Sequence, residues 1–358
     1  MKKNVTLYDV AVLAKVSGQT VSRVLNTPDK VSERTRDRVF SAMKTLRYVP
    51  NRPAQLLAGK ISSTIGIITA SLVFHAPSQI IASIQNHAAK NGFQTSIIMP
   101  EKQDYNALQH ALNELQAQNI KGVIINLPVE SEVAERLVIE NINVSCVFLD
   151  VSVETDVSMI CFDYKEGCSK CVRHLWSLGH RHFGLLAGPQ DSISARLRLN
   201  IWRNTLHQLG CTDAVTVFGD WGSDSGWSKT IELFRLKPDI SAIVVGNDQM
   251  ALGVLSALKY LNKTGGNSVS VTGYDDTEGS QYFSPSLTTV RHDFNLLGMR
   301  AVEVLLDKIK TPDRKFFELL PVEMVIRNST GKYNNKQDIS IMKIRRVLQQ
   351  ALDELGHC

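Results

Sequence analysis

Polar side chains follow several short apolar runs in the middle of the chain. Asn126, Asp150, Asn247 and Asp275 each stand at the end of such a run. A sugar hydroxyl both donates and accepts hydrogen bonds, so carboxylates can accept from it and amides can do both. Taken singly, each residue is better explained as a helix cap or a turn residue. Four of them at four run ends favour a ligand with many hydroxyl groups.

A second polar cluster lies near the N-terminus, on an amphipathic segment of residues 19–26. Its apolar residues Val21, Val24 and Leu25 are expected to face inward. Its outward face carries hydrogen-bonding side chains: Gln19, Thr20, Ser22, Arg23 and Asn26. Arg can pair with guanine and Gln with adenine in the major groove of DNA. The alternative is the polar outer face of a generic three-helix bundle.

The segments around this cluster have the pattern of a helix-turn-helix. Thr6 and Asp9 have the spacing of a capping box at the start of a first helix. Ser17 can cap the second helix after a tight turn, and Ser32 is expected to cap a third. Two short helices joined by a turn of three or four residues are typical of DNA-binding proteins.

The charge distribution supports this interpretation. Residues 1–60 contain 12 Lys and Arg against 4 Asp and Glu, a net charge of +8, whereas the remainder carries a net charge of −3. A basic head on a mildly acidic body indicates a polyanion-binding segment attached to a domain with another role. A basic, solvated helical surface without a partner is the alternative.

The composition excludes several classes of protein. The chain has 358 residues, 43% hydrophobic and 21% charged, which is ordinary for a globular protein of two or three domains. No apolar run approaches the roughly 20 residues of a membrane helix, and the N-terminus lacks the pattern of a signal peptide. Six cysteines in so long a chain do not form a disulfide framework. We therefore expect a cytoplasmic protein with no membrane partner.

Between residues 62 and 330, β-branched runs alternate with amphipathic stretches. The candidate strands are Thr64–Thr69, Thr95–Met99, Gly122–Asn126, Val144–Leu149, Phe183–Ala187, Ala242–Gly246 and Val269–Gly273. This alternation predicts an α/β fold of doubly wound parallel sheets, and the number of strands favours two lobes. Ligands of such folds bind beyond the carboxyl ends of the strands, so the polar residues should meet in a cleft.

Two further segments flank this body. Asn51, Pro53 and Gly59 suit the start and the end of a two-turn helix that is too short to be stable alone. Near the C-terminus, the polar residues 331–340 are expected to form a linker. Apolar residues then recur at spacings of three and four, which predicts an oligomerisation helix: Ile341, Ile344, Leu348, Ala351 and Leu355. A helix that docks on its own body is the alternative.

Three motifs of the head resemble the lac repressor family of bacterial regulators: Leu7-Tyr-Asp-Val-Ala11, Val16-Ser-Gly-Gln-Thr-Val-Ser-Arg-Val24 and Asn51-Arg-Pro-Ala-Gln-Leu-Leu-Ala-Gly59. The resemblance extends over essentially the whole chain. Body segments such as Ser194-Ala-Arg-Leu-Arg198 and Gly273-Tyr-Asp-Asp-Thr-Glu278 favour a regulator of β-galactoside response over a relative that responds to another sugar.

The resemblance implies an all-α helix-turn-helix head, two periplasmic-binding-protein-like lobes and a C-terminal helix. The implied boundaries are 1–49 for the head, 50–61 for a hinge helix and linker, 62–330 for the sugar-binding and dimerisation core, 331–340 for a linker and 341–358 for a tetramerisation helix. A dimer would bind a pseudo-palindromic operator, and an allolactose-like galactoside would release it. Dimers would join into a homotetramer. No catalysis, cofactor or metal is implied.

The resemblance also implies which residues bind. The DNA-binding residues would be Leu7, Tyr8, Ser17, Gly18, Gln19, Thr20, Ser22, Arg23 and Asn26 of the head, with Asn51, Ala54 and Leu57 of the hinge. In the cleft, the hydroxyl-binding residues would be Asp150, Arg198, Asn247 and Asp275, with Trp221 and Phe294 as an apolar wall. Around them would lie His75, Pro77, Ile80, Asn126, Phe162, Ser194, His292 and Leu297.

Four positions depart from the relatives that respond to β-galactosides. Gly18 stands where those relatives have a large aromatic residue that contacts a base, and Phe74 replaces a leucine beside the ligand. Ala70 replaces a serine and His292 replaces a glutamine. The operator sequence and the inducer preference are therefore open.

Other functions and sites receive less support. A sugar-processing enzyme would need a positioned acid and base, and a transport binding protein would lack the DNA-binding head. Cys168 and Cys171 form a lone C-x-x-C without the second pair that a zinc ribbon needs. His174, His180 and His182 lack metal-site spacing and are expected at the surface.

Overall fold

The computed structural model describes residues 5–49, 64–264 and 268–333 of the chain. It divides into two compact units, Met1–Ser62 and Ser63–Cys358, which we call the head and the body. Each unit is described by itself. The hinge helix and the tetramerisation helix expected from the sequence lie outside the described residues.

The head is a bundle of three helices: α1 (Leu7–Ala14), α2 (Gly18–Asn26) and α3 (Glu33–Leu46). Its core is closed by small and β-branched side chains, among them Val10, Val21 and Val39, which are fully buried. A capping box starts α1 as predicted, because the Thr6 N–H donates to the Asp9 carboxylate at 2.7 Å and the Asp9 N–H donates to the Thr6 hydroxyl at 3.4 Å.

The next two helices begin in different ways. The Ser17 hydroxyl accepts from the Thr20 N–H at 3.1 Å, so the predicted cap of α2 is confirmed. The predicted side-chain cap of α3 is wrong. The Ser32 hydroxyl donates instead to the Thr35 hydroxyl at 3.0 Å and accepts nothing from the helix backbone.

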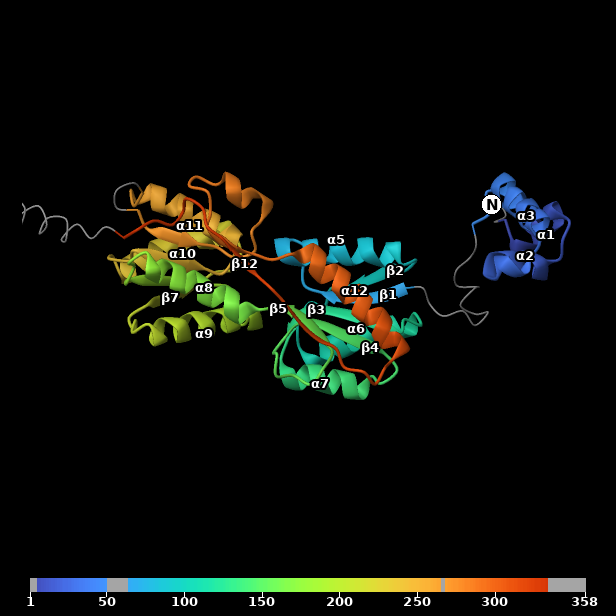
Figure 1. Ribbon diagram of the computed structural model, residues 1–358, viewed down its shortest axis with the longest axis horizontal. Helices are drawn as coiled ribbons and strands as arrows, with labels where there is room; N and C mark the ends of the chain where they lie inside the picture. The colour runs from blue at the N-terminus through green and yellow to red at the C-terminus, as the bar shows by residue number, and fades with distance from the viewer. Residues whose placement is uncertain (1–4, 50–63, 265–267, 334–358) are drawn as a thin grey trace, which may run out of the picture. The chain divides into compact units, whose positions relative to one another are not determined.

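The body contains two parallel sheets with helices on both faces (Figure 1). The sheet of the first lobe has the order β11-β5-β4-β3-β1-β2. Its strands are β1 (Thr64–Thr69), β2 (Gln94–Ile98), β3 (Gly122–Val129), β4 (Ser145–Val151), β5 (Met159–Phe162) and β11 (Phe317–Leu320). The sheet of the second lobe has the order β7-β6-β8-β9. Its strands are β6 (Phe183–Ala187), β7 (Val215–Phe218), β8 (Ala242–Val245) and β9 (Ser270–Thr272).

Helices from distant parts of the chain cover these sheets. In the first lobe, α5 (His75–Lys90) and α12 (Phe294–Lys310) pack together on one face, and α6 (Tyr105–Ala117) and α7 (Ser131–Glu140) pack on the other. In the second lobe, α8 and α9 share one face and α10 and α11 share the other. Their bounds are Tyr164–Ser177, Ile193–Gln208, Ser223–Leu236 and Asp248–Tyr260.

The chain passes three times between the lobes. It leaves the first lobe after β5, returns between β10 (Thr289–Arg291) and α12, and leaves again between β11 and β12 (Glu323–Val325). Strands β10 and β12 pair antiparallel, so two of the passages run side by side. The expected α/β fold with two doubly wound lobes is therefore present, and both lobes are assembled from separate parts of the chain.

Several details differ from the sequence prediction. Strands β5, β7, β10, β11 and β12 are additional to the seven predicted strands. Asn126 does not end its strand, since β3 continues to Val129 after a shift in its register with β4 between Ile125 and Pro128. His180 is not a surface residue: it is 1% exposed, and its ring nitrogens lie 3.1 Å from the Ser241 hydroxyl and 3.0 Å from the Gly331 carbonyl.

Close packing of α10 against α11 depends on a glycine. A Cβ atom at Gly253 would lie 2.0 Å from the Ser223 carbonyl oxygen, which belongs to rigid backbone. We expect Gly253→Ala to destabilise the body by about 1–3 kcal/mol, measured as a lower urea midpoint. Gly279→Ala is the control, because its Cβ would meet only Phe283 at 3.5 Å. Equal midpoints for the two variants would contradict this account of the packing.

Candidate functional site

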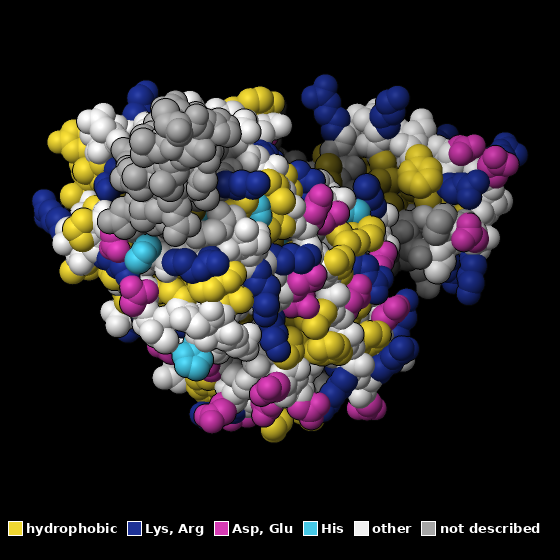
Figure 2. Space-filling view, turned by 60° about the vertical axis from the view of Figure 1, so that its left-hand side comes forward, with side chains coloured by type: hydrophobic (Ala, Val, Ile, Leu, Met, Phe, Trp, Pro, Cys, Tyr) yellow, Lys and Arg dark blue, Asp and Glu magenta, His cyan; other side chains and the backbone are white. Residues whose placement is uncertain are grey.

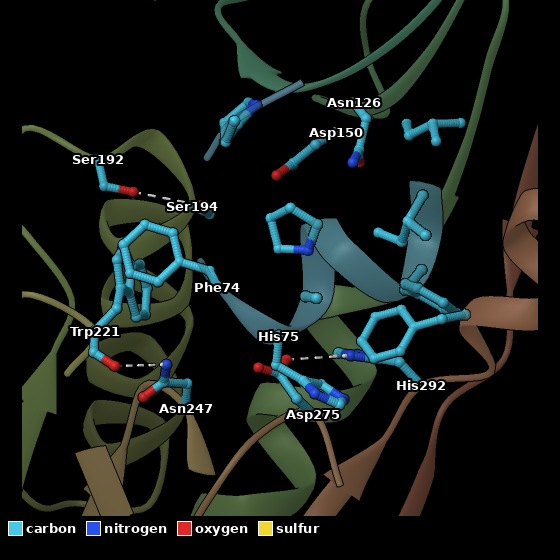
Figure 3. Close-up of a pocket in the computed structure, with 18 of the residues that line it drawn as sticks. Phe74, His75, Asn126, Asp150, Ser192, Ser194, Trp221, Asn247, Asp275 and His292 are labelled. Carbon is cyan, nitrogen blue, oxygen red and sulfur yellow. Dashed lines mark hydrogen bonds and ion pairs between the residues drawn. The ribbon is translucent and has the colours of Figure 1, made fainter. Parts of the chain in front are cut away.

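A pocket in the body is lined by side chains from both lobes (Figure 3). All fourteen residues proposed for the cleft line it: His75, Pro77, Ile80, Asn126, Asp150, Phe162, Ser194, Arg198, Trp221, Asn247, Asp275, His292, Phe294 and Leu297. The structure therefore brings together residues that are up to 222 positions apart in the sequence. This convergence follows from the topology, since the carboxyl ends of parallel strands share one edge of each sheet.

The first lobe contributes an amide and a carboxylate. The Asn126 amide donates to the Thr69 hydroxyl at 3.1 Å, which leaves its carbonyl oxygen available. Asp150 is the penultimate residue of β4, so it lies close to the predicted strand end. Burial raises the pKa of Asp150 to about 6, and the positive charge of Arg198 opposes that shift.

The second lobe contributes a buried guanidinium. Arg198, on α9, is only 9% exposed. Its Nη1 donates to the Gly246 carbonyl, and its guanidinium carbon lies 4.2 Å from the centre of the Tyr274 ring. Its Nε is buried without a hydrogen-bond partner among the described residues. A buried donor of this kind is costly unless a ligand or water accepts from it.

Asn247 combines two roles. Its side-chain oxygen accepts from the Met250 N–H at 2.9 Å, so it is indeed the cap of α11. Its amide nitrogen donates to the Trp221 carbonyl at 3.1 Å (Figure 3). The helix-cap explanation is thus correct, and it does not remove the residue from the pocket.

The loop that carries Asp275 has an unusual backbone. Asp275 and Asp276 have φ angles of 113° and 52°, which non-glycine residues rarely adopt. Such strain persists only where neighbouring contacts hold it. The buried Asp248 supplies them, since its carboxylate accepts from the Thr277 N–H at 2.8 Å and also from the hydroxyls of Ser280 and Thr289. Burial, with a smaller contribution from the charge of Asp275, raises the pKa of Asp248 to about 7.

Aromatic side chains form the apolar wall. Phe294 meets His75 and Phe162 edge to face, with ring centres 5.9 Å apart in both pairs. Trp221 has a φ of 73° and packs over two glycines. A Cβ atom at Gly188 would lie 2.3 Å from the indole ring, and one at Gly246 would lie 3.0 Å from it. Flat apolar faces beside hydrogen-bonding groups suit the two faces of a sugar ring.

The head presents the predicted polar surface of α2. Gln19 and Arg23 are exposed, Thr20 and Ser22 are half-buried, and Val21 is fully buried. At the start of the helix, Ser17 is exposed and Gly18 is half-buried, and on α1 Leu7 is half-buried while Tyr8 is 72% exposed. The Asn26 side chain and the hinge residues Asn51, Ala54 and Leu57 lie outside the described residues. The same holds for the oligomerisation residues Ile341, Ile344, Leu348, Ala351 and Leu355.

Gly18 is not required by packing. A Cβ atom at this position would meet only Leu7, at an ordinary contact distance of 3.5 Å. A larger residue would therefore fit at the start of α2. The glycine removes a side chain from the surface that faces DNA in helix-turn-helix proteins.

Comparison with known proteins assigns the family. Residues 6–51 match the model of the bacterial regulatory proteins of the lacI family, and residues 172–330 match a periplasmic binding protein-like domain. The chain is 56% identical to the lactose operon repressor of Klebsiella pneumoniae over 328 residues, which cover 92% of this chain and 93% of that protein. The chain belongs to the lacI family.

Two further lacI-family relatives extend the comparison. The lactose operon repressor of Escherichia coli (strain K12) is 43% identical over 92% of this chain and 91% of its own length. A crystal structure of a lac repressor dimer bound to operator and the anti-inducer ONPF has a TM-score of 0.86. It is 43% identical, and the match covers 92% of this chain and all of that chain. The predicted family and fold are thereby confirmed.

The pocket of this lacI-family protein also includes residues that the sequence did not single out as binding residues. They are Ala76, Gln103, Pro128, Leu149, Tyr164, Ser192 and Gln249. Ala70 and Phe74, noted above as departures, line it as well. Tyr164 follows β5, which was not among the predicted strands, so the sequence did not place it at a strand end. Gln249 lies two residues after Asn247, so its closeness to a predicted binding residue could have indicated it.

Other candidate chemistry finds no support in the described residues. Within 5–49, 64–264 and 268–333, no group of three or more His, Cys, Asp or Glu side chains could hold a metal ion. Cys168 and Cys171 are both fully buried on α8. No helix in these ranges is long and apolar enough to cross a membrane. On the face of the body shown in Figure 2, Lys and Arg side chains are interspersed with Asp and Glu.

The position of Trp221 should depend on Gly188. We expect Gly188→Ala to displace the indole ring, because the added Cβ would overlap it at 2.3 Å. Acrylamide quenching of tryptophan fluorescence should increase, since the displaced ring becomes more exposed. Gly279→Ala serves as the control, and acrylamide should quench its tryptophan fluorescence to the same extent as in the unmodified protein. Unchanged quenching in Gly188→Ala would show that the ring relaxes without leaving the wall.

Proposed function

We propose that this protein is a sugar-responsive transcriptional repressor that binds a pseudo-palindromic operator and is released by a β-galactoside of the allolactose type. The observation that carries the proposal is the pocket. Two carboxylates, four amides and a guanidinium converge there beside an aromatic wall, in a chain that also has a helix-turn-helix head. The 56% identical relative is named a lactose operon repressor.

The proposed mechanism is allosteric. A homodimer places two α2 helices in successive major grooves, and the hinge residues 50–61 form helices on the operator. Sugar binding favours an arrangement of the lobes in which the hinge helices cannot pair. By thermodynamic linkage, operator and sugar then weaken each other's binding. The helix of residues 341–358 joins dimers into a homotetramer.

The finer assignments belong to the same proposal. The domain boundaries are those implied by the family resemblance, and the fourteen pocket residues and the α2 surface are the proposed contacts. The protein acts in the cytoplasm and has no catalytic activity. In support, the relatives are named lactose operon repressors.

The function can be tested by letting the protein select its own operator. Full-length protein would select binding sites from a random DNA pool, and the enriched sequence would then be titrated with allolactose, cellobiose and ribose. We expect an approximately two-fold symmetric site and release by allolactose alone. Release by another sugar would assign the protein to a different branch of the family. If the selection enriched no sequence, the repressor function would be contradicted.

Arg23 is proposed to read a base. We expect Arg23→Ala to weaken operator binding by roughly 1–3 kcal/mol and to relax the preference at one base pair of each half-site. The control is Arg34→Ala, which removes the same charge from an exposed position on α3. It should weaken binding equally on all sequences. A uniform loss for Arg23→Ala would assign Arg23 to the phosphate backbone instead.

Asp275 is proposed to accept hydrogen bonds from sugar hydroxyls. We expect Asp275→Asn to weaken allolactose binding by about 1.5–3 kcal/mol for each charged hydrogen bond lost. Operator affinity should stay nearly unchanged, because the head is a separate unit. The exposed Asp191 supplies the control, and Asp191→Asn should bind both ligands normally. Normal release of Asp275→Asn by allolactose would remove Asp275 from the site.

A further inference from the structure

His292 lies directly behind the carboxylate of Asp275. Its Nδ1 is 3.6 Å from Asp275 Oδ1, too far for a hydrogen bond (Figure 3). Asp275 Oδ1 is buried and has no hydrogen-bond partner among the described residues. Both side chains are at least nine-tenths buried. The imidazole of His292 is therefore a prospective donor to this carboxylate, in addition to the charged Arg198 in the same pocket.

Four aromatic rings fix the orientation of this imidazole. It stacks on Phe162 with ring centres 4.3 Å apart at 24°, and Tyr274 meets it edge to face at 4.7 Å. Tyr164 and Phe294 pack edge to face at 6.3 and 5.7 Å. His292 also follows β10 at one of the passages between the lobes. The ring can move little, so its nitrogen stays directed at Asp275.

The protonation state of the ring follows from its surroundings. Burial lowers the pKa of His292, and this outweighs the opposing influence of Asp275, so the ring is neutral near pH 7. A neutral imidazole carries one proton, on Nδ1 or on Nε2. A lone pair on Nδ1 would repel the carboxylate. No described residue hydrogen-bonds to Nε2, so nothing competes for the proton.

We propose that His292 is a positioning residue that donates its Nδ1 proton to Asp275 and thereby orients the second carboxylate oxygen toward hydroxyl groups of the ligand. This inference rests on the proposed sugar-binding function and assigns the way in which the site selects its ligand. A carboxylate held as an acceptor favours a ligand group that donates, such as an equatorial or axial sugar hydroxyl. It disfavours an ether or a carbonyl at the same place. A shift of a few tenths of an ångström would bring the 3.6 Å contact within hydrogen-bond distance.

A matched pair of variants separates the proton from the packing. In His292→Asn, the amide nitrogen stands at the same number of bonds from Cβ as Nδ1 and can still donate. His292→Leu has the same branching without a donor. We expect His292→Leu to raise the allolactose dissociation constant of the full-length protein about tenfold or more. In His292→Asn, this constant should stay within about threefold of the value for the unmodified protein.

A second measurement needs no ligand. Magic-angle-spinning NMR of full-length protein with ¹⁵N-labelled histidine reports which ring nitrogen carries the proton, and the His292 signal is the one that disappears in His292→Asn. We expect a neutral ring with the proton on Nδ1. In Asp275→Asn, the preference for this tautomer should fall, because the carboxylate that imposes it is gone.

Each outcome decides the inference. Equal allolactose affinities for His292→Leu and His292→Asn would show that His292 acts by packing alone. A larger loss of allolactose affinity in His292→Asn than in His292→Leu would also overturn the proposal. A proton found on Nε2 would overturn it as well. If the unmodified protein binds no allolactose, the proposed function fails, and the NMR measurement alone then decides whether His292 positions Asp275.

Discussion

The pocket depends on one buried carboxylate that never faces it. Asp248 is completely buried and stands next to Asn247 in the chain. Through its hydrogen bonds to the loop of residues 277–280, it holds Asp275 in a backbone conformation that would otherwise relax. Asp276 completes the support, since its carboxylate accepts from Arg291 and Arg327, both at 2.7 Å. Removing such a buried, hydrogen-bonded charge would leave several donors unpaired at once.

The strands and the pocket residues show how far the fold and the site could be predicted from the sequence. Periodicity located seven of the strands and the two-lobed fold, because parallel strands that are buried on both faces appear as continuous apolar runs. The strand-end argument correctly brought Asp150 and Asp275 to one pocket. Asn126 also lines this pocket, but it does not end its strand, since a register shift inside β3 cannot be inferred from residue types. The contact between His292 and Asp275 and the packing of Trp221 on Gly188 depend on backbone geometry, for which the sequence has no local signal.

The departures from the relatives fall on two surfaces. Gly18 leaves the start of α2 without a side chain, and packing does not require this, since a Cβ atom there would meet only Leu7 at 3.5 Å. Phe74 and His292 line the pocket, where His292 is enclosed by aromatic rings. Gly18 thus belongs to the proposed DNA-binding surface, whereas Phe74 and His292 belong to the proposed ligand site.

The three passages between the lobes have a consequence for how the protein is made. The first lobe is begun by β1 but contains α12 and β11, which come more than 200 residues later. On the ribosome, its sheet stays one strand short and one face stays without α12 until nearly the whole body has been synthesised. The second lobe, whose sheet spans residues 183–272, can pair its strands first. Synthesis from the N-terminus therefore does not set the order of assembly here, and the first lobe needs protection from aggregation during that interval.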